Sequence, residues 1–147
     1  MTNKEVVQEW FKKVWHEGDT RTIHKMFESS GKAAGLGARP IAGPTEFEAF
    51  QKAMFGLIEN VKISIDQSFE SGEWIAVFCT LEAKKRGSDK KIVMPGSCSL
   101  RIKDDVILEA YNHWEFMAFF EQLDLLPKDS FATCLQGKPI SSATSKQ

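Results

Sequence analysis

The first part of the chain shows the apolar spacing of an amphipathic helix. Residues 2–5 read Thr-Asn-Lys-Glu, the pattern of a capping box in which side chains at both ends satisfy free backbone donors. Apolar residues then recur three and four positions apart over residues 6–15, which places them on one helix face. We expect this helix to end at Gly18 and a short second helix to follow over residues 20–27.

A glycine-rich stretch separates these helices from a third one. Residues 29–43 contain four glycines and a proline, so they predict a loop, with one short strand around residues 32–36. A second capping-box pattern at residues 45–48 indicates the start of the third helix, whose apolar residues again share one side.

From residue 61 onward the apolar period changes from helical to alternating. Four strands are expected, joined by tight turns and a charged hairpin tip at 84–91; they cover residues 61–69, 74–83, 92–102 and 106–114. Apolar residues at helical spacing then predict a helix from residue 116, and residues 129–135 favour one more short helix. Helices followed by an antiparallel meander predict an α+β fold, with the helices on one face of the sheet.

Length and composition fit one folded domain. The chain has 147 residues, of which 42% are hydrophobic, including eleven Phe and four Trp. A chain of this size can bury a core without needing a metal or a disulfide. We assign residues 1–137 to a single domain and expect residues 138–147 to form a flexible polar tail.

Charge and cysteine content argue against several classes of partner. The formal net charge is −1, so there is no basic surplus to follow a phosphate backbone, and we expect no nucleic-acid partner. The three cysteines are widely separated without metal-binding spacing, so we expect no metal and a reducing, cytoplasmic location. The first residues lack a signal-peptide pattern and charges interrupt the apolar stretch 6–15, so we expect no membrane segment.

The most informative chemistry lies in the last strand. Tyr111, His113 and Glu115 occupy alternate positions, so an extended chain points all three the same way. A helix rich in phenylalanine follows directly after Glu115. A carboxylate beside so much hydrocarbon either faces water or lines an apolar pocket, where it is tuned for proton transfer.

Each of these residues also has a purely structural interpretation. Glu115 is equally placed to act as a carboxylate at a helix N-terminus, favoured by the helix dipole. Tyr111 either donates to an enolate oxygen or packs in the core, and His113 is either a second acid or base or an exposed histidine. Asn112 lies on the opposite strand face, where it either contacts the substrate or caps the next helix.

Several short motifs resemble those of the SnoaL-like polyketide cyclases, a branch of the nuclear transport factor 2-like superfamily. The resemblance extends over residues 6–137. Its motifs are Trp-His-Glu-Gly-Asp at residues 15–19, Gly-Pro-x-x-Phe at residues 43–47, and Glu-x-Tyr-Asn-x-x-Glu at residues 109–115, followed by Gln122 and Leu123.

The resemblance implies a conical sandwich of helices on a curved antiparallel sheet, also described as a cystatin-like fold, with an interior pocket. It implies ring closure by intramolecular aldol condensation, with no metal or organic cofactor, and assigns the general base to Glu115. It also implies a homodimer. This sequence departs from the family pattern at Ala34, where many relatives have His, and it has Tyr111 for Trp and Glu115 for Asp.

We expect a cofactor-independent lyase or isomerase acting on a small, largely apolar carbonyl compound. Catalysis would fall to Glu115, Tyr111 and His113. The substrate would be contacted by Asn112, Trp10, Val14, Phe50, Met54, Met94 and Cys98. Cys98 has no basic neighbour in sequence that would make it a nucleophile.

Two other functions remain open. The first is epoxide hydrolysis or dehydration, which on this fold uses paired carboxylates with an Arg, and no Arg lies in the closing segment. The second is a binding and dimerisation module without turnover, in which an outer sheet face around Trp74, Ala76 and Phe78 serves the dimer.

Overall fold

The structure is a computed structural model that describes residues 1–140, so the predicted tail at 138–147 lies outside the described residues from position 141 on. Its N-terminal elements are α1 (Asn3–Trp10), the π-helix η1 (Phe11–His16), α2 (Thr20–Met26), β1 (Phe27–Ala34), β2 (Ile41–Ala42) and α3 (Gly43–Phe55). The remaining elements are β3 (Ile58–Ser71), β4 (Trp74–Lys85), β5 (Lys91–Lys103), β6 (Val106–Trp114), α4 (Phe116–Gln122) and α5 (Ser130–Leu135).

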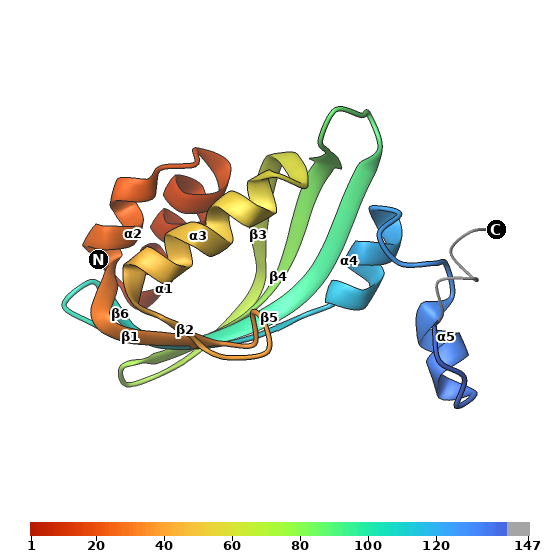
Figure 1. Cartoon of the computed structure of the whole chain (residues 1–147). Helices are drawn as coiled ribbons and strands as arrows, with labels where there is room; N and C mark the ends of the chain where they lie inside the picture. The colour runs from red at the N-terminus through yellow and green to blue at the C-terminus, as the bar shows by residue number, and fades with distance from the viewer. Residues whose placement is uncertain (141–147) are drawn as a thin grey trace.

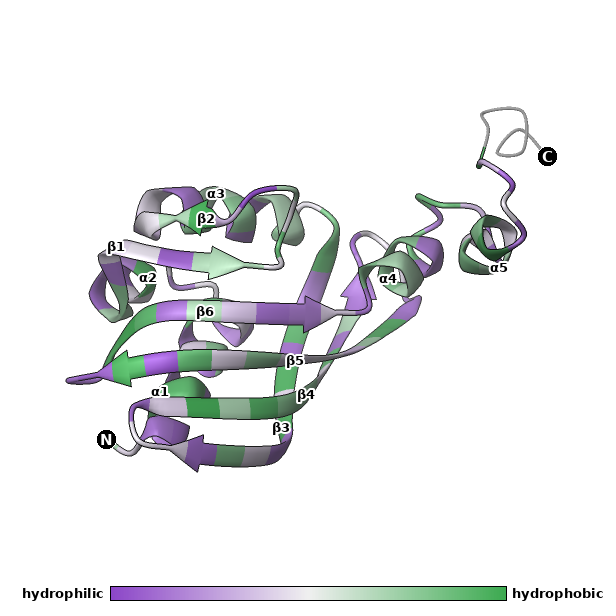
Figure 2. Ribbon diagram, turned by 90° about the horizontal axis from the view of Figure 1, so that it is seen from below, coloured by the Kyte–Doolittle hydropathy of each residue, from purple (hydrophilic) through white to green (hydrophobic). Residues whose placement is uncertain are grey.

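The six strands form one curved sheet in the order β2-β1-β6-β5-β4-β3. All neighbours are antiparallel except β1 and β6, which are parallel. The helices α1, α2 and α3 cover one face of the sheet (Figure 1), which we call the inner face. The opposite, outer face is seen in Figure 2, and α4 and α5 lie beyond the end of β6. The predicted α+β class is therefore confirmed.

The start of α1 follows the predicted capping box. The Thr2 hydroxyl accepts a hydrogen bond from the Glu5 backbone N–H at 3.1 Å, and the Thr2 N–H donates to the Glu5 carboxylate at 2.8 Å. These two bonds satisfy backbone donors that have no partner within the helix. The same carboxyl group has a lowered pKa because the Thr2 backbone N–H and hydroxyl bind its charged form.

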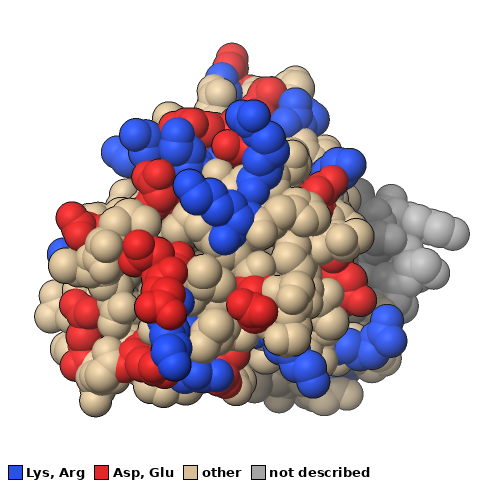
Figure 3. Space-filling model, turned by 90° about the vertical axis from the view of Figure 1, so that its left-hand side faces the viewer, with Lys and Arg blue, Asp and Glu red and all other residues tan. Residues whose placement is uncertain are grey.

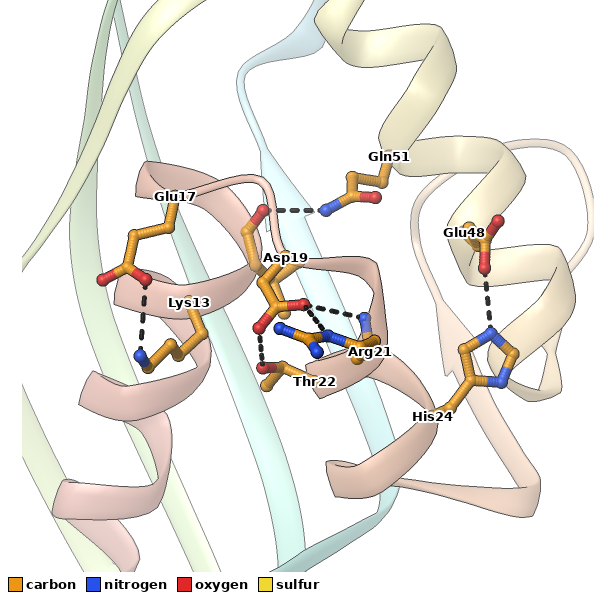
Figure 4. Close-up of polar contacts among 9 residues, drawn as sticks. Lys13, Glu17, Asp19, Arg21, Thr22, His24, Glu48 and Gln51 are labelled. Carbon is orange, nitrogen blue, oxygen red and sulfur yellow. Dashed lines mark hydrogen bonds and ion pairs between the residues drawn. The ribbon is translucent and has the colours of Figure 1, made fainter.

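The first helix continues as a π-helix, which the sequence did not predict. In this segment the Glu17 N–H donates to the Lys12 carbonyl, five residues earlier, at 2.9 Å. The Val14 carbonyl instead accepts from the side-chain amide of Gln51 on α3, at 2.9 Å (Figure 4). Gln51 is only 1% exposed, so a buried hydrogen bond ties α3 to the π-helix.

The prediction was wrong in three respects around the third helix. The short strand expected near residues 32–36 is longer and begins at Phe27, and the short strand β2 was missed. The buried residues of β1 include Gly31 and Ala33, which are too small to give an alternating apolar pattern. This segment is a strand because it pairs with β6 and β2. The capping box expected at 45–48 is absent, because α3 already begins at Gly43.

Charges are mixed on the face of the molecule seen in Figure 3. Acidic and basic side chains are interspersed there, with several Lys and Arg gathered near the top of the view. None of the helices in the part of the chain that the structure describes is both long enough and apolar enough to span a bilayer.

Candidate ligand cavity

A narrow cavity lies between the helices and the inner face of the sheet. Its helical walls are formed by Trp10, Phe11, Trp15, Phe47, Phe50 and Met54. Its sheet walls include Ile63, Leu81, Met94, Cys98, Asn112 and Trp114, with Phe116 of α4 at the edge. The cavity volume is about 60 Å³.

The helical wall is a cluster of aromatic rings in edge-to-face contact. Trp10 and Phe47 have ring centroids 5.1 Å apart, and Trp15 and Phe50 have centroids 6.0 Å apart. Phe27 of β1 joins the cluster at 5.8 Å from Phe47. Such pairs stabilise a fold by about 0.5–1.5 kcal/mol each beyond their buried area, so this wall is assembled before any ligand enters.

The polar group best placed in the cavity is the Asn112 amide. Its nitrogen donates to the Ala34 carbonyl at 3.1 Å, and its oxygen lies 3.5 Å from the indole nitrogen of Trp114. An amide has two N–H donors and two acceptor lone pairs, so one donor and one acceptor position remain for a ligand. Among the described residues, no Asp, Glu, His, Lys or Arg side chain lines this cavity.

The Trp114 ring can lie against β5 because residue 96, opposite it on that strand, is a glycine. Gly96 pairs with Trp114 in the β5–β6 register, and a Cβ atom at residue 96 would lie 2.2 Å from the indole ring. Sequence analysis missed Trp114 as a lining residue. A glycine inside a predicted strand is the signal that pointed to a close approach at this position.

Cys98 lines the cavity as a neutral thiol. Its pKa is raised by a hydrogen bond with Cys79 and by burial, both of which favour the protonated form. A protonated thiol is a poor nucleophile. The side chain therefore acts as a soft, apolar part of the wall.

Tyr111, His113 and Glu115 lie on the outer face of the sheet, not in the cavity. All three are exposed, Tyr111 by 45%, and none of them lines the aromatic cavity. His113 and Glu115 instead border a shallow outer hollow. The three share a side, as their alternate spacing predicts, but the expectation that this side lines an apolar pocket is wrong, because Asn112 and Trp114 occupy the inner positions of β6.

The outer face carries a charged network centred on Glu109. Tyr111 donates to this carboxylate at 2.7 Å, and Arg101 donates to its other oxygen at 2.6 Å. The Tyr111 hydrogen bond and then the Arg101 guanidinium lower the pKa of Glu109, and the carboxylate raises the pKa of Tyr111. An Arg–carboxylate pair of the kind expected for epoxide hydrolysis thus exists, but it lies outside the cavity.

Most of the predicted substrate contacts do line the cavity. They are Trp10, Phe50, Met54, Met94, Cys98 and Asn112. Val14 does not: its side chain is fully buried in the core, and the lining position next to it is taken by Trp15, which we expected to serve packing or an interface. No group of three or more His, Cys, Asp or Glu side chains within residues 1–140 is arranged to hold a metal ion.

Known structures share this architecture. One is a protein with a ketosteroid isomerase-like fold from Catenulispora acidiphila, in complex with trimethylamine; the match has a TM-score of 0.72 at 18% identity, covering 84% of this chain and 95% of that one. A candidate SnoaL-like polyketide cyclase from Jannaschia sp. CCS1 matches with a TM-score of 0.73 at 15% identity, covering 85% and 93%. IdmH, a candidate polyketide cyclase from Streptomyces antibioticus, matches with a TM-score of 0.71 at 12% identity, covering 84% and 99%.

These neighbours define the fold as ketosteroid isomerase-like, the class expected from the sequence. The profile of the SnoaL-like polyketide cyclases matches residues 5–123. The chain belongs to this family, which confirms the resemblance seen in its motifs. No curated protein gives a significant match to the sequence.

Proposed function

We propose that this protein binds a small, largely apolar carbonyl compound in the aromatic cavity. The observation that supports this proposal is a cavity lined by aromatic and aliphatic side chains around the amide of Asn112. Apolar walls supply most of the affinity of such pockets, and a few polar groups fix the orientation of the ligand. The free N–H of Asn112 would donate to the carbonyl oxygen of the ligand.

The test compares a residue of the inner face with its neighbour on the outer face. Benzylacetone, a neutral ketone with an aromatic ring, serves as the probe, with tryptophan fluorescence and calorimetry as readouts. Asn112→Leu should weaken its binding about two- to tenfold, since one hydrogen bond contributes about 0.5–1.5 kcal/mol. His113→Gln should leave binding unchanged. Equal affinities for wild type and Asn112→Leu would contradict the proposal.

A second candidate is cofactor-independent ring closure or isomerisation, favoured by membership in the polyketide cyclase family. Glu115 would be the general base, because it stands between Trp114 and Phe116, which both line the cavity. This reaction requires the carboxylate to turn inward from its exposed position at the start of α4. Glu115→Gln should then abolish turnover without changing ligand affinity, and Tyr111→Phe should slow turnover less. Unchanged rates would exclude both roles.

We also propose a homodimer formed through the outer sheet face. Four aromatic side chains are exposed on the described part of this face: Phe69 and Phe78 at 53%, Tyr111 at 45% and Trp74 at 37%. Exposed apolar patches of this kind are typical of interaction sites. Arg101 and Glu109 on the same face already neutralise each other in an ion pair at 2.6 Å, so two copies related by a two-fold axis can approach without opposing net charge from this pair.

A further inference from the structure

A second hollow lies on the opposite side of the cavity wall. It is a groove between the first helix and the edge strand β3, with a volume of about 530 Å³. On one side lie Lys4, Gln8, Lys12 and His16, and on the other lies the β3 segment 62–65. The four helical residues follow one another at intervals of four, so they form one stripe along α1 and η1.

The groove is positively charged. Lys4, Lys12 and Lys62 line it, and no Asp or Glu does so among the described residues. Within residues 1–140 none of these three lysines forms an ion pair. Unpaired ammonium groups at one hollow attract an anion. Lys62 also borders a neighbouring hollow that Glu82 and Asp89 line, whereas Lys4 and Lys12 have no acidic residue beside them in the described lining of the groove.

His16 ties the helical side of the groove to the edge strand. Its Nδ1 lies 3.1 Å from the Val61 carbonyl of β3. A carbonyl only accepts, so Nδ1 carries the hydrogen. This contact also holds the charged stripe of the helix against the edge strand.

The groove and the aromatic cavity share a wall. Phe11 and Ile63 line both hollows. The cavity alone, at about 60 Å³, is small beside the pockets of roughly 300–1,000 Å³ that hold drug-sized ligands. A ligand that anchors on Asn112 and is larger than a few atoms must therefore extend out of the cavity, and the groove behind Phe11 and Ile63 is one place that could receive it.

We infer that the ligand is an anionic amphiphile: its apolar part lies in the cavity and its carboxylate or phosphate group lies among Lys4, Lys12 and Lys62. Phe11 and Ile63 move apart to let it pass. This inference rests on the proposed function of the cavity and adds the charge of the ligand. It also assigns the selection of an anionic ligand to these three lysines.

The test uses three compounds with the same aromatic body: benzylacetone, phenylbutyrate and phenylpropyl phosphate. The wild-type protein should bind one or both anions at least about tenfold more tightly than the ketone at low salt. The advantage should shrink as salt is raised, because the lysines are exposed to solvent. The better-bound anion identifies whether the groove prefers a carboxylate or a phosphate.

Variants of neighbouring lysines separate the groove from general charge effects. The double variant Lys12→Gln, Lys62→Gln should lose the preference for anions and keep its affinity for benzylacetone. Lys13→Gln is the matched control, since Lys13 follows Lys12 but pairs with Glu17 at 3.3 Å and does not line the groove (Figure 4). Phe50→Ala removes one ring of the cavity wall, so it should weaken all three compounds if one ligand spans both hollows.

The outcomes are distinguishable. Equal affinity for ketone and anions, or an anion preference that survives in the double variant, overturns the inference and leaves the cavity proposal standing. Anion binding that is unchanged in Phe50→Ala also overturns it, since the groove would then act alone. If none of the compounds binds, both the inference and the proposed function of the cavity fail.

Discussion

Consecutive residues of β6 face two different environments. Asn112 and Trp114 point to the inner face and line an aromatic cavity, whereas Tyr111 and His113 point outward, where Tyr111 stacks on Trp74 with ring centroids 6.1 Å apart. The inner face offers an uncharged amide in apolar surroundings. The outer face offers charges, a histidine and exposed rings. The chemistry of this strand is therefore divided between alternate positions: the inner residues line the cavity, and the outer residues belong to the face where we propose the dimer.

The largest effect should come from the outer face. Phe78→Glu places a charge in the proposed dimer interface, and two-fold symmetry places it there twice. Loss of an aromatic hot spot typically weakens binding by about 2 kcal/mol or more, so the dimer dissociation constant should rise at least about 100-fold. Sedimentation should show monomers at concentrations where the wild type is dimeric. Affinity for benzylacetone should not change; if it falls, the two faces are not independent.

The second-largest effect, a loss of stability, should come from residue 96 on the inner face of β5. Gly96→Ala would force Trp114 away from the sheet, since the added Cβ has no room beside the indole. Overpacking of this kind usually destabilises a protein by about 1–3 kcal/mol, measured here by urea unfolding. Ser97→Ala, one residue along on the outer face, is the control and should stay within about 0.5 kcal/mol of wild type. Similar losses for both variants would show that residue 96 has no special role.

A comparable or smaller effect is expected at Gln51. Gln51→Leu leaves the Val14 carbonyl without its buried donor, which should lower the free energy of unfolding by about 1–3 kcal/mol. Lys52→Ala on the solvent side of α3 should change it by less than about 0.5 kcal/mol. We also expect weaker ligand binding in Gln51→Leu, because Trp15 lies on the segment that this bond holds. Wild-type stability in Gln51→Leu would mean that the hydrogen bond contributes nothing.

The smallest expected effect is a shift of one titration. Tyr111 is the single tyrosine of the chain, so alkaline ultraviolet absorbance reports on it alone. Its pKa should lie above that of a free tyrosine, because the Glu109 carboxylate accepts from the neutral hydroxyl and repels the phenolate. Glu109→Gln should lower the Tyr111 pKa toward its ordinary value. An unchanged titration in that variant would show that the hydrogen bond does not persist in solution.

The sequence predicted the elements better than it predicted the site. Helical spacing located α1 and α2, and alternation located β3 to β6, because those segments carry large apolar residues at regular intervals. The strand β1 lacks such residues, and only its pairing with β6 and β2 makes it a strand. The π-helix was not predicted because Phe11, Val14 and Trp15 fit ordinary α-helical spacing equally well.

The face of β6 was misassigned because hydrophobicity does not separate its two sides. One set of alternate positions holds Tyr111 and His113, and the other holds Asn112 and Trp114, so each contains one aromatic and one polar residue. Which of the two sets faces inward is decided by partners distant in sequence, such as Gly96 beneath Trp114 and Ala34 beside Asn112. The lining residues on helices were easier to predict, since the apolar stripe of a helix must face the sheet.

The π-helix sets how far α1 is rotated about its own axis relative to the rest of the molecule. Its hydrogen bonds enclose one residue more than those of an α-helix, so deletion of a single residue from η1 would restore α-helical winding. Everything before the deletion would then rotate by about 100° about the helix axis. Such a rotation would carry Trp10 off the aromatic wall and Lys4 of α1 away from β3 in a single step. One backbone irregularity thus sets the angular position of both hollows.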